Sequence, residues 1–191
     1  MNKENNTRGF TLVELIVTFA LIGILMAVGA QMIASCYSTY YGAKSAAGGT
    51  QVSQTVSAYI KSELSGALYF GDTGSVIISA DKSSIEYTDS EGNRAVLKLK
   101  GGDKKYLKKT ILSPDGTEKD APGLSETAYM GYYLTGISFT CPGADDEYPS
   151  NVIQADLGLD NDTYGSYKRT DHIRLYHLGG IEKAIIQKDG G

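Results

Sequence analysis

The chain has 191 residues, a hydrophobic content of 41% and a formal net charge of −4, which allow one globular domain and a substantial additional element. This charge excludes a global attraction to nucleic acid or to anionic lipid, although a local basic patch could still act. Two cysteines, Cys36 and Cys141, stand outside any CxxC pair. A disulfide-rich scaffold and a thiolate zinc site are therefore not expected.

The first 30 residues divide into a short polar leader and a long apolar run. Lys3 and Arg8 lie in the leader, residues 1–9, and the run FTLVELIVTFALIGILMAVGA covers residues 10–30. As a helix, these 21 residues would reach about 31 Å, close to the roughly 30 Å hydrocarbon thickness of a bilayer. The basic leader predicts that it stays in the cytoplasm and that the chain beyond about Gln31 is exported.

Glu14 is the one charged residue in the apolar run. A carboxylate near the start of a spanning helix is costly and usually marks a function. If the chain is cut after Gly9, the new α-amine of Phe10 lies four residues away, and Glu14 of one subunit could neutralise that amine on a neighbour. Removing either partner would leave a buried charge unpaired, at a cost of roughly several kcal/mol. We expect Glu14 to set the register of subunits in an assembly.

The stretch RGFTLVE, residues 8–14, resembles the class III signal of type IV prepilins and pseudopilins. The resemblance implies that a prepilin peptidase cleaves after Gly9 and methylates Phe10, while Glu14 serves subunit assembly. It also implies three other kinds of partner: pilin or pseudopilin subunits, an inner-membrane assembly platform, and the lipid bilayer before assembly. The chain differs from many major pilins in one respect: they have a proline near the position that Gln31 occupies here.

Two simpler interpretations of the N-terminus remain open. An ordinary secretory signal would have Lys3 and Arg8 before an apolar region and would be cut after small residues ending at Ala30. A plain signal anchor is the second. Neither explains a glutamate inside the apolar run beside a Gly-Phe step. Either would make the chain an exported binding domain, secreted or membrane-anchored, instead of a filament subunit.

A second helical pattern follows the apolar run. Its apolar positions recur every four residues and predict an amphipathic continuation of the first helix. We expect glycines to interrupt this continuation at Gly42 and at Gly48-Gly49. Its apolar stripe should pack on the globular domain, whereas the first part of the helix must lie in lipid or among copies of itself. The stripe consists of Val52, Val56, Ile60, Leu64 and Leu68.

From Ser75 onward the apolar pattern changes to period two, which is typical of β-strands. Gly179-Gly180 predicts a hairpin loop between strands at residues 172–178 and 181–187. Residues 113–126 and 142–167 are rich in Gly, Pro and Asp and are predicted to be loops. The other predicted strands cover residues 76–79, 85–88, 94–100, 106–112 and 129–140.

These patterns predict an α+β fold that is pilin-like. A long N-terminal α-helix, its first half transmembrane, packs by its second half on a C-terminal antiparallel β-domain. The expected domains are a leader at residues 1–9, a transmembrane and filament-core helix at 10–36, an amphipathic continuation at 37–70 and a β-rich domain at 71–191. The order of YLKKTIL, YYLTGISFT and HIRLYHL resembles larger minor pilins and pseudopilins, which favours a minor subunit.

The sequence indicates no enzyme and no cofactor. His172 and His177 are five residues apart on one predicted strand, so they should face opposite sides and cannot share a metal ion. No nucleophile elbow, P-loop or metalloprotease motif is present. The oxygen-rich loop with Asp156, Asp160 and Asp162 could hold calcium, but its spacing is not that of an EF-hand, and a solvated acidic loop is the simpler interpretation.

The basic cluster of the β-domain has two interpretations. In the family that the N-terminus resembles, competence-associated members are thought to capture DNA. Lysines along a pair of strands would make a salt-sensitive contact with phosphate. The candidate residues for this contact are Lys104, Lys105, Lys108 and Lys109. The favoured alternative is an edge hairpin that lysines keep from pairing with other sheets. The cluster also contains Lys98 and Lys100.

The expected function is that of a structural minor pilin or pseudopilin in a pilus, type II secretion or competence filament. The expected location is a single pass through the cytoplasmic (inner) membrane with an extracytoplasmic C-terminal domain, followed by a cell-surface or periplasmic filament. Cys36 falls just beyond the predicted span and Cys141 at the end of a strand, and we expect both to be free thiols.

Overall fold

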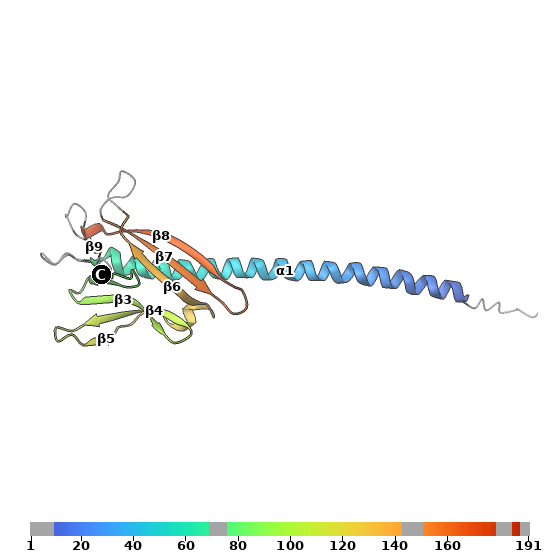
Figure 1. The fold of residues 1–191 in the computed structure, drawn as a ribbon, viewed down its shortest axis with the longest axis horizontal. Helices are drawn as coiled ribbons and strands as arrows, with labels where there is room; N and C mark the ends of the chain where they lie inside the picture. The colour runs from blue at the N-terminus through green and yellow to red at the C-terminus, as the bar shows by residue number, and fades with distance from the viewer. Residues whose placement is uncertain (1–9, 69–75, 143–150, 179–184, 188–191) are drawn as a thin grey trace, which may run out of the picture. The chain divides into compact units, whose positions relative to one another are not determined.

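The computed structural model describes residues 10–68, 76–142, 151–178 and 185–187. A long helix, α1 (Leu12–Ser65), precedes a set of strands and short 3₁₀ helices, which confirms the predicted α+β class (Figure 1). The chain divides into two compact units between Ala43 and Lys44. The elements after α1 are β1 (Val76–Ile78), β2 (Ile85–Thr88), β3 (Arg94–Gly101), β4 (Lys105–Leu112), β5 (Glu118–Asp120), η2 (Glu126–Tyr129), β6 (Tyr133–Thr140), β7 (Val152–Asp160), β8 (Tyr167–Arg174), η3 (Tyr176–Leu178) and β9 (Ile185–Gln187).

In the second unit, the described strands form one sheet in the order β8-β7-β6-β4-β3-β2-β1-β9, with β5 paired to β4. Neighbouring strands are antiparallel except β1 and β9, which are parallel. Strands β4 and β6 share the single pair Lys105 and Leu134. Beyond it the Tyr129 hydroxyl accepts the Leu107 N–H at 3.0 Å, so this backbone donor on β4 stays satisfied where the two strands separate.

The four strands predicted between residues 76 and 112 are confirmed, and each begins and ends within one or two residues of its predicted limits. The predicted strand at residues 129–140 is shorter than expected. Its first residue, Tyr129, ends the 3₁₀ helix η2, and Met130 turns the chain in the left-handed region before β6 begins at Tyr133. The predicted strand therefore combines a helical turn with a strand.

The predicted loop at residues 142–167 is wrong, because it contains the whole of β7. In β7, buried Ile153, Ala155, Leu157 and Leu159 alternate with polar residues or glycine. Such alternation is the pattern of a strand with one face on the core. The Gly and Asp content that suggested a loop belongs to the other face of β7.

The predicted C-terminal hairpin is also wrong. Residues of β8 pair with β7, from Tyr167 opposite Leu159 to Arg174 opposite Val152. The chain then enters η3, and β9 pairs in parallel with β1. The predicted loop at Gly179-Gly180 lies outside the described residues. Strands β8 and β9 therefore stand at opposite ends of the strand order and do not pair with each other as a hairpin.

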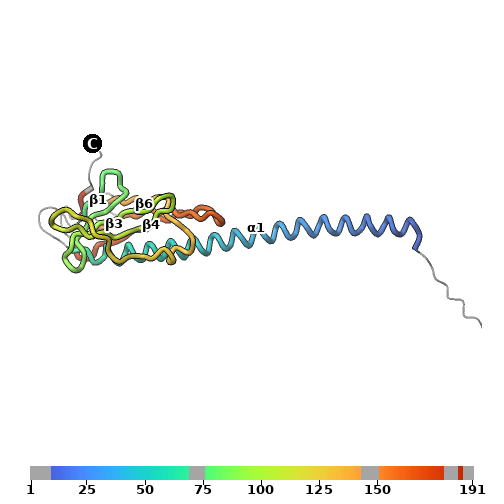
Figure 2. Tube along the Cα trace, turned by 90° about the horizontal axis from the view of Figure 1, so that it is seen from below, coloured from blue at the N-terminus to red at the C-terminus, as the bar shows by residue number. Residues whose placement is uncertain are grey.

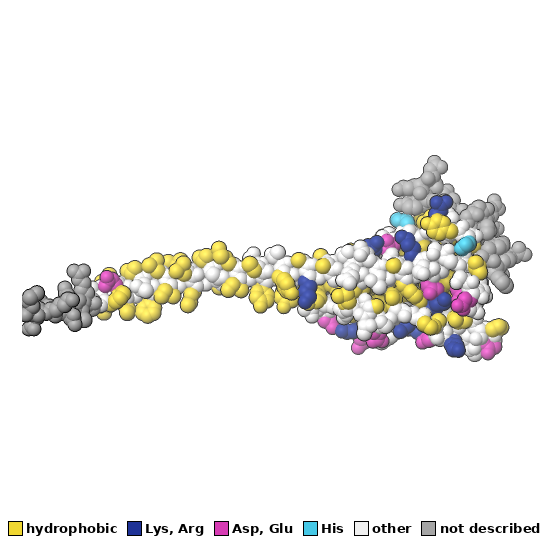
Figure 3. All heavy atoms as spheres, turned by 180° about the vertical axis from the view of Figure 1, so that it is seen from behind, with side chains coloured by type: hydrophobic (Ala, Val, Ile, Leu, Met, Phe, Trp, Pro, Cys, Tyr) yellow, Lys and Arg dark blue, Asp and Glu magenta, His cyan; other side chains and the backbone are white. Residues whose placement is uncertain are grey.

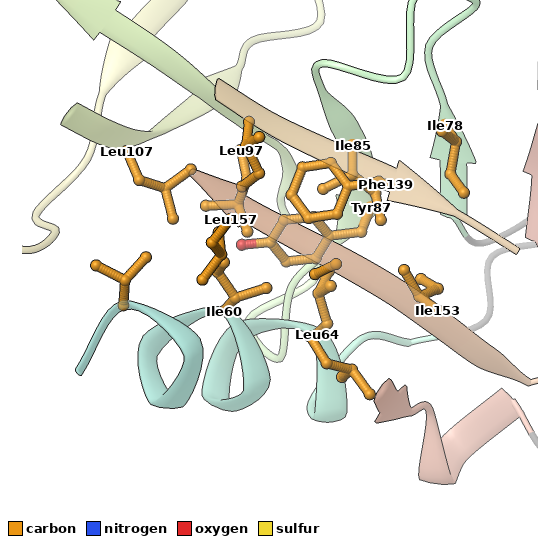
Figure 4. Packing of buried hydrophobic residues seen from close by; sticks show 14 of the residues in the cluster. Ile60, Leu64, Ile78, Ile85, Tyr87, Leu97, Leu107, Phe139, Ile153 and Leu157 are labelled. Carbon is orange, nitrogen blue, oxygen red and sulfur yellow. The ribbon is translucent and has the colours of Figure 1, made fainter. Parts of the chain in front are cut away.

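The core lies between the sheet and residues 44–65 of α1, which run along one face of the sheet (Figures 1 and 2). The predicted stripe of α1 is confirmed at four of its five positions, since Val52, Val56, Ile60 and Leu64 are at most 1% exposed. The fifth, Leu68, lies beyond the end of the helix and is half-buried. Figure 4 shows Ile60 and Leu64 below side chains from several strands. Those side chains are Ile78, Ile85, Tyr87, Leu97, Leu107, Phe139, Ile153 and Leu157.

The predicted interruption of the helix by glycine is wrong, because α1 is continuous through Gly42 and Gly48-Gly49. An added Cβ on Gly49 would lie 2.9 Å from the Tyr167 ring, and one on Gly48 would lie 3.1 Å from the Tyr132 hydroxyl. These two glycines permit a close approach of helix and sheet. Packing against the tyrosines offsets the low helix propensity of glycine, which costs about 1 kcal/mol relative to alanine.

Candidate processing and assembly site

The start of α1 is held by a reciprocal pair of hydrogen bonds between Thr11 and Glu14. The Glu14 N–H donates to the Thr11 hydroxyl at 3.3 Å, and Glu14 Oε2 accepts the Thr11 N–H at 2.9 Å. The Thr11 hydroxyl also donates to Oε2 at 3.0 Å. This is a capping box, in which Thr11 caps the helix and the third helical residue returns the bond. Two of the unpaired N–H groups at the helix start are satisfied in this way.

Sequence reasoning missed Thr11, although the signal was present. The spacing T-x-x-E before an apolar run marks a helix N-terminus, and it occurs here as Thr11 and Glu14. Glu14 therefore has a local role that its position in the apolar run did not suggest. Both bonds from Thr11 use Oε2; within the described part of the chain, Oε1 accepts no hydrogen bond.

The first part of α1 carries apolar side chains around its surface (Figure 3). An 18-residue window of this helix has a mean hydropathy of 2.5, and none of the window is buried. Its length and composition fit a membrane span. Phe10, immediately before the helix, is 79% exposed. The exposed large side chains of this part include Leu12, Val13, Ile16, Phe19, Ile24, Leu25, Met26, Met32 and Ile33.

The three predicted functional residues are close in sequence, and the structure describes two of them. Glu14 lies in the first turn of α1, and Phe10 precedes that turn with its side chain exposed. Gly9, the residue before the expected cleavage, lies outside the described residues. A carboxylate beside a chain end and in front of a long apolar helix can bind a cation, and an N-terminal ammonium is the cation that cleavage would create.

The lysine cluster lies mostly in ion pairs. Lys98 contacts Glu118 at 2.6 Å, Lys100 contacts Asp120, and Lys104 contacts Asp162 at 2.6 Å. The acidic partners come from β5 and from the turn after β7, so they neutralise much of the basic character that the sequence suggested. Lys105 is exposed on β4 and Lys108 is half-buried. Lys109 faces the other side of β4, toward α1.

The interpretation of the lysines as edge protection is wrong. Strand β3 lies between β2 and β4, and β4 lies between β3 and β6, so neither is at an edge of the described sheet. In this register Lys98 is opposite Lys108, an arrangement that like-charge repulsion disfavours. Glu118 of the neighbouring strand β5 relieves the repulsion by pairing with Lys98. Lys98 and Lys100 therefore add ion pairs to β5, which already pairs with β4 through its backbone.

Lys109 belongs to a buried polar cluster beneath α1 that the sequence did not reveal. Its ammonium lies 2.9 Å from Glu63 of α1 and 3.2 Å from Asp89, and these three side chains are 13%, 20% and 5% exposed. The Tyr87 hydroxyl donates to the same Glu63 carboxylate at 2.7 Å. Burial and then the hydrogen bond to Glu63 raise the pKa of Tyr87. The cluster fixes the helix to strands β2 and β4.

The three aspartates considered for calcium have other partners. Asp156 accepts from Gln154 and Thr170, and Asp160 and Asp162 both accept from the Tyr133 hydroxyl. Among the described residues, no group of three or more His, Cys, Asp or Glu side chains is arranged to hold a metal ion. The loop after β7 is instead a turn held by the Asn161 side chain, which accepts the N–H groups of Thr163 and Tyr164.

The histidines do not lie on one strand, so the predicted geometry is wrong. His172 belongs to β8, and His177 lies in η3. The chain leaves the sheet after Arg174 because Leu175 and Leu178 turn into the core, where both are buried. The two cysteines are free thiols; Cys36 is exposed and Cys141 is half-buried, where burial raises the pKa of the Cys141 thiol.

Residues 5–30 match the family model of the prokaryotic N-terminal methylation motif. No curated protein and no solved structure matches the chain. The match covers Gly9, Phe10, Thr11 and Glu14, so the chain carries the class III signal of type IV prepilins and pseudopilins. Together with the long apolar helix, this motif supports a type IV pilin-like, membrane-anchored protein that prepilin peptidase processes. Proteins with this motif are structural rather than catalytic.

Proposed function

We propose that this chain is a minor pilin or pseudopilin subunit. Prepilin peptidase cuts it between Gly9 and Phe10 and methylates the Phe10 amine, and the subunit then joins a filament through the first part of α1. In this proposal residues 1–9 are the leader, 10–36 the membrane and filament-core helix, 37–70 its amphipathic continuation and 71–191 the β-domain. The observation that carries the proposal is a single carboxylate, Glu14, at the start of the first part of α1, which is otherwise uncharged up to Lys44 and carries exposed apolar side chains.

The exposed apolar surface of the first part of α1 requires an apolar partner. Before assembly the lipid bilayer covers it, and in a filament the helices of other subunits do. Because lipid already covers these side chains before assembly, close packing between helices and polar pairing drive their association, and not the removal of apolar surface from water. Contacts of this kind are head-to-tail and generate an open helical polymer. The assembly platform in the inner membrane would transfer subunits from one environment to the other.

Glu14 gives this apolar association a defined register. Its Oε2 is occupied by Thr11, and Oε1 is the oxygen that would receive the Phe10 ammonium of a neighbouring subunit. Both charges leave water together, so each compensates the other. Loss of one partner would leave a buried charge and cost about 3–5 kcal/mol. This corresponds to roughly 100-fold or more in the affinity of a subunit for the filament.

A test of the proposal must separate the charge of Glu14 from its role in the capping box. Glu14→Gln serves this purpose, because glutamine at the third helical position also completes a capping box but cannot neutralise an ammonium. Glu14→Ala removes both roles. The measurement is the fraction of each variant in sheared filaments relative to membranes, in cells that supply the assembly machinery, with membrane insertion checked by alkaline extraction.

The proposal expects both variants to insert in the membrane and both to be nearly absent from filaments. If Glu14→Gln enters filaments as well as the wild-type chain, the charge pair is not used and Glu14 acts only at the helix start. If the wild-type chain is never found in filaments, the chain is instead an anchored domain with a pilin-like signal.

A further inference from the structure

Three tyrosines form an exposed aromatic cluster in the first unit, after the apolar run of α1. Tyr37, Tyr40 and Tyr41 are 61%, 59% and 42% exposed. Tyr37 stacks on Tyr41 with ring centroids 6.0 Å apart, and Tyr40 meets Tyr41 edge-on at 5.6 Å. Their spacing of three and four residues places them on one side of the helix. The proposed function, which concerns Phe10 and Glu14, does not use them.

The residues around the tyrosine cluster are polar but uncharged. Between Glu14 and Lys44 the sequence contains no Asp, Glu, Lys, Arg or His. Ser38 and Thr39, which lie among the tyrosines, donate their hydroxyls to the Ser35 carbonyl at 2.9 and 3.0 Å. Because these hydroxyls are bonded within the helix, the segment can enter a region of intermediate polarity. The apolar run, residues 10–30, ends before it.

The distance along the helix places the cluster at a membrane surface. The 27 residue steps from Phe10 to Tyr37 correspond to about 40 Å at about 1.5 Å per residue. A bilayer is about 40–45 Å thick with its headgroup layers and about 30 Å without them. If Phe10 lies at the cytoplasmic surface, Tyr37 therefore lies in the outer headgroup layer. Tyrosine favours this layer because its ring is apolar and its hydroxyl is polar.

We propose that Tyr37, Tyr40 and Tyr41 bind the headgroup layer of the outer leaflet and set the depth of the helix in the bilayer before assembly. The proposal rests on the membrane insertion in the proposed function, and it adds a role for residues outside the methylation motif. With the tyrosines held at this level, Glu14 lies about 35 Å away along the helix. The carboxylate then lies at the inner headgroup boundary and not in hydrocarbon, where a charge is most costly.

The tyrosine cluster matters most after the leader has been cleaved from the chain. The leader contains the basic residues Lys3 and Arg8, which would hold the precursor at the cytoplasmic surface. Once the leader is removed, the mature N-terminus keeps only its amine and Glu14 at that end. The aromatic cluster then holds the other end of the span at a fixed level. Glu14 thereby stays where it can meet the amine of another subunit.

The absence of tryptophan from the chain permits a direct test by fluorescence. Tyr40→Trp and, separately, Leu25→Trp each introduce a sole tryptophan into the full-length chain, which is reconstituted in phosphatidylcholine and phosphatidylglycerol vesicles. Lipids brominated at different acyl positions then report the depth of each tryptophan. Leu25 is the matched control, because it lies near the midpoint between Phe10 and Tyr37 and is 71% exposed.

The proposal expects Trp at position 40 to be quenched most by bromine near the headgroup, and Trp at position 25 by bromine near the bilayer centre. Replacing Tyr37, Tyr40 and Tyr41 by serine in the Leu25→Trp background should shift the depth of that tryptophan measurably. An unchanged depth in this variant overturns the proposal, even if filament incorporation falls, because the cluster then serves subunit contacts. If Trp at position 25 is not quenched by any lipid, membrane insertion itself fails, and the proposed function fails with it.

Discussion

At the start of α1 the Thr11 hydroxyl accepts the Glu14 N–H at 3.3 Å and donates to the Glu14 carboxylate, at Oε2, at 3.0 Å. The residue proposed to pair with a neighbouring subunit is therefore already oriented inside its own chain. A carboxylate that keeps one oxygen on Thr11 loses little side-chain freedom when its second oxygen binds a neighbour, so the capping box prepares Glu14 for assembly.

The first prediction concerns Thr11. Thr11→Val keeps the shape of the side chain but removes the hydroxyl, and it should cost about 1 kcal/mol of helix stability at the first turn. We expect faster amide exchange in residues 12–15 and a several-fold reduction in filament incorporation, less than that of Glu14→Gln. Thr11→Ser, which keeps the hydroxyl, is the matched control. Exchange rates that are equal in all three proteins would show that the capping box is not formed in the membrane.

The second prediction concerns the cluster beneath α1. Lys109→Met leaves Glu63 and Asp89 buried without their cation, and we expect a loss of about 2–4 kcal/mol. For a chain of this size the melting temperature should fall by roughly 2–4 °C per kcal/mol. Lys98→Met is the control on the neighbouring strand; its pair with Glu118 is more exposed and should contribute less than about 1 kcal/mol. Equal melting temperatures for the two variants in detergent would contradict this account.

The third prediction is an acid-sensitive contribution from Asp89. Burial alone would raise the pKa of Asp89, but hydrogen bonds from the Asn93 N–H and from Lys109 outweigh it, and the pKa is lowered. A lowered pKa in the folded state stabilises the fold above the unfolded value of about 3.9. This contribution is lost as the pH falls through the folded value. Between pH 2 and pH 7 the melting temperature should therefore depend less on pH for Asp89→Asn than for the wild type. An equal pH dependence in the two proteins would refute the assignment.

The same cluster has an opposite dependence at high pH. Burial alone would lower the pKa of Lys109, but Glu63 and Asp89 raise it above its ordinary value. A raised pKa stabilises the fold at every pH below the unfolded value of about 10.4, and the contribution disappears as the pH rises through the folded value. Between these limits the ion pairs stay intact, so stability near neutral pH should not depend on this cluster's titration.

The fourth prediction concerns the contact between helix and sheet at Gly49. Gly49→Ala would place a methyl group 2.9 Å from the Tyr167 ring, and the resulting overpacking should cost about 1–3 kcal/mol. The gain in helix propensity, about 1 kcal/mol, offsets part of it. Gly42→Ala, where the added methyl meets nothing within 4 Å, should be neutral or slightly stabilising. A more stable Gly49→Ala protein in thermal unfolding would show that the helix can move away from Tyr167.

The sequence predicted those parts of the fold whose signal is local. The apolar run, the stripe from Val52 to Leu64 and the strands from Val76 to Leu112 follow from periodicity alone. Strand β7 was missed because Asp156, Gly158 and Asp160 resemble a loop by composition, whereas the buried Leu157 and Leu159 alternate with them. In this case the period was the better guide than the residue types.

Other features depend on contacts that are distant in sequence. Strand β9 pairs with β1, which no local pattern around Gly179-Gly180 could indicate. Lys109 points toward Glu63, 46 residues away, while its neighbour Lys108 lies on the other face, so the lysine run was interpreted as one patch. At the candidate site the motif identified Gly9, Phe10 and Glu14. Thr11 was missed, although its spacing from Glu14 is a local signal of a capping box.

The intact mass of the protein purified from membranes of cells that contain prepilin peptidase tests the central claim most directly. Our account predicts one species, the chain beginning at Phe10 with one added methyl group. Methylation should be located on Phe10 by fragmentation of the N-terminal peptide. A mass corresponding to cleavage after Ala30, or to the uncut chain in the presence of active peptidase, would contradict the account.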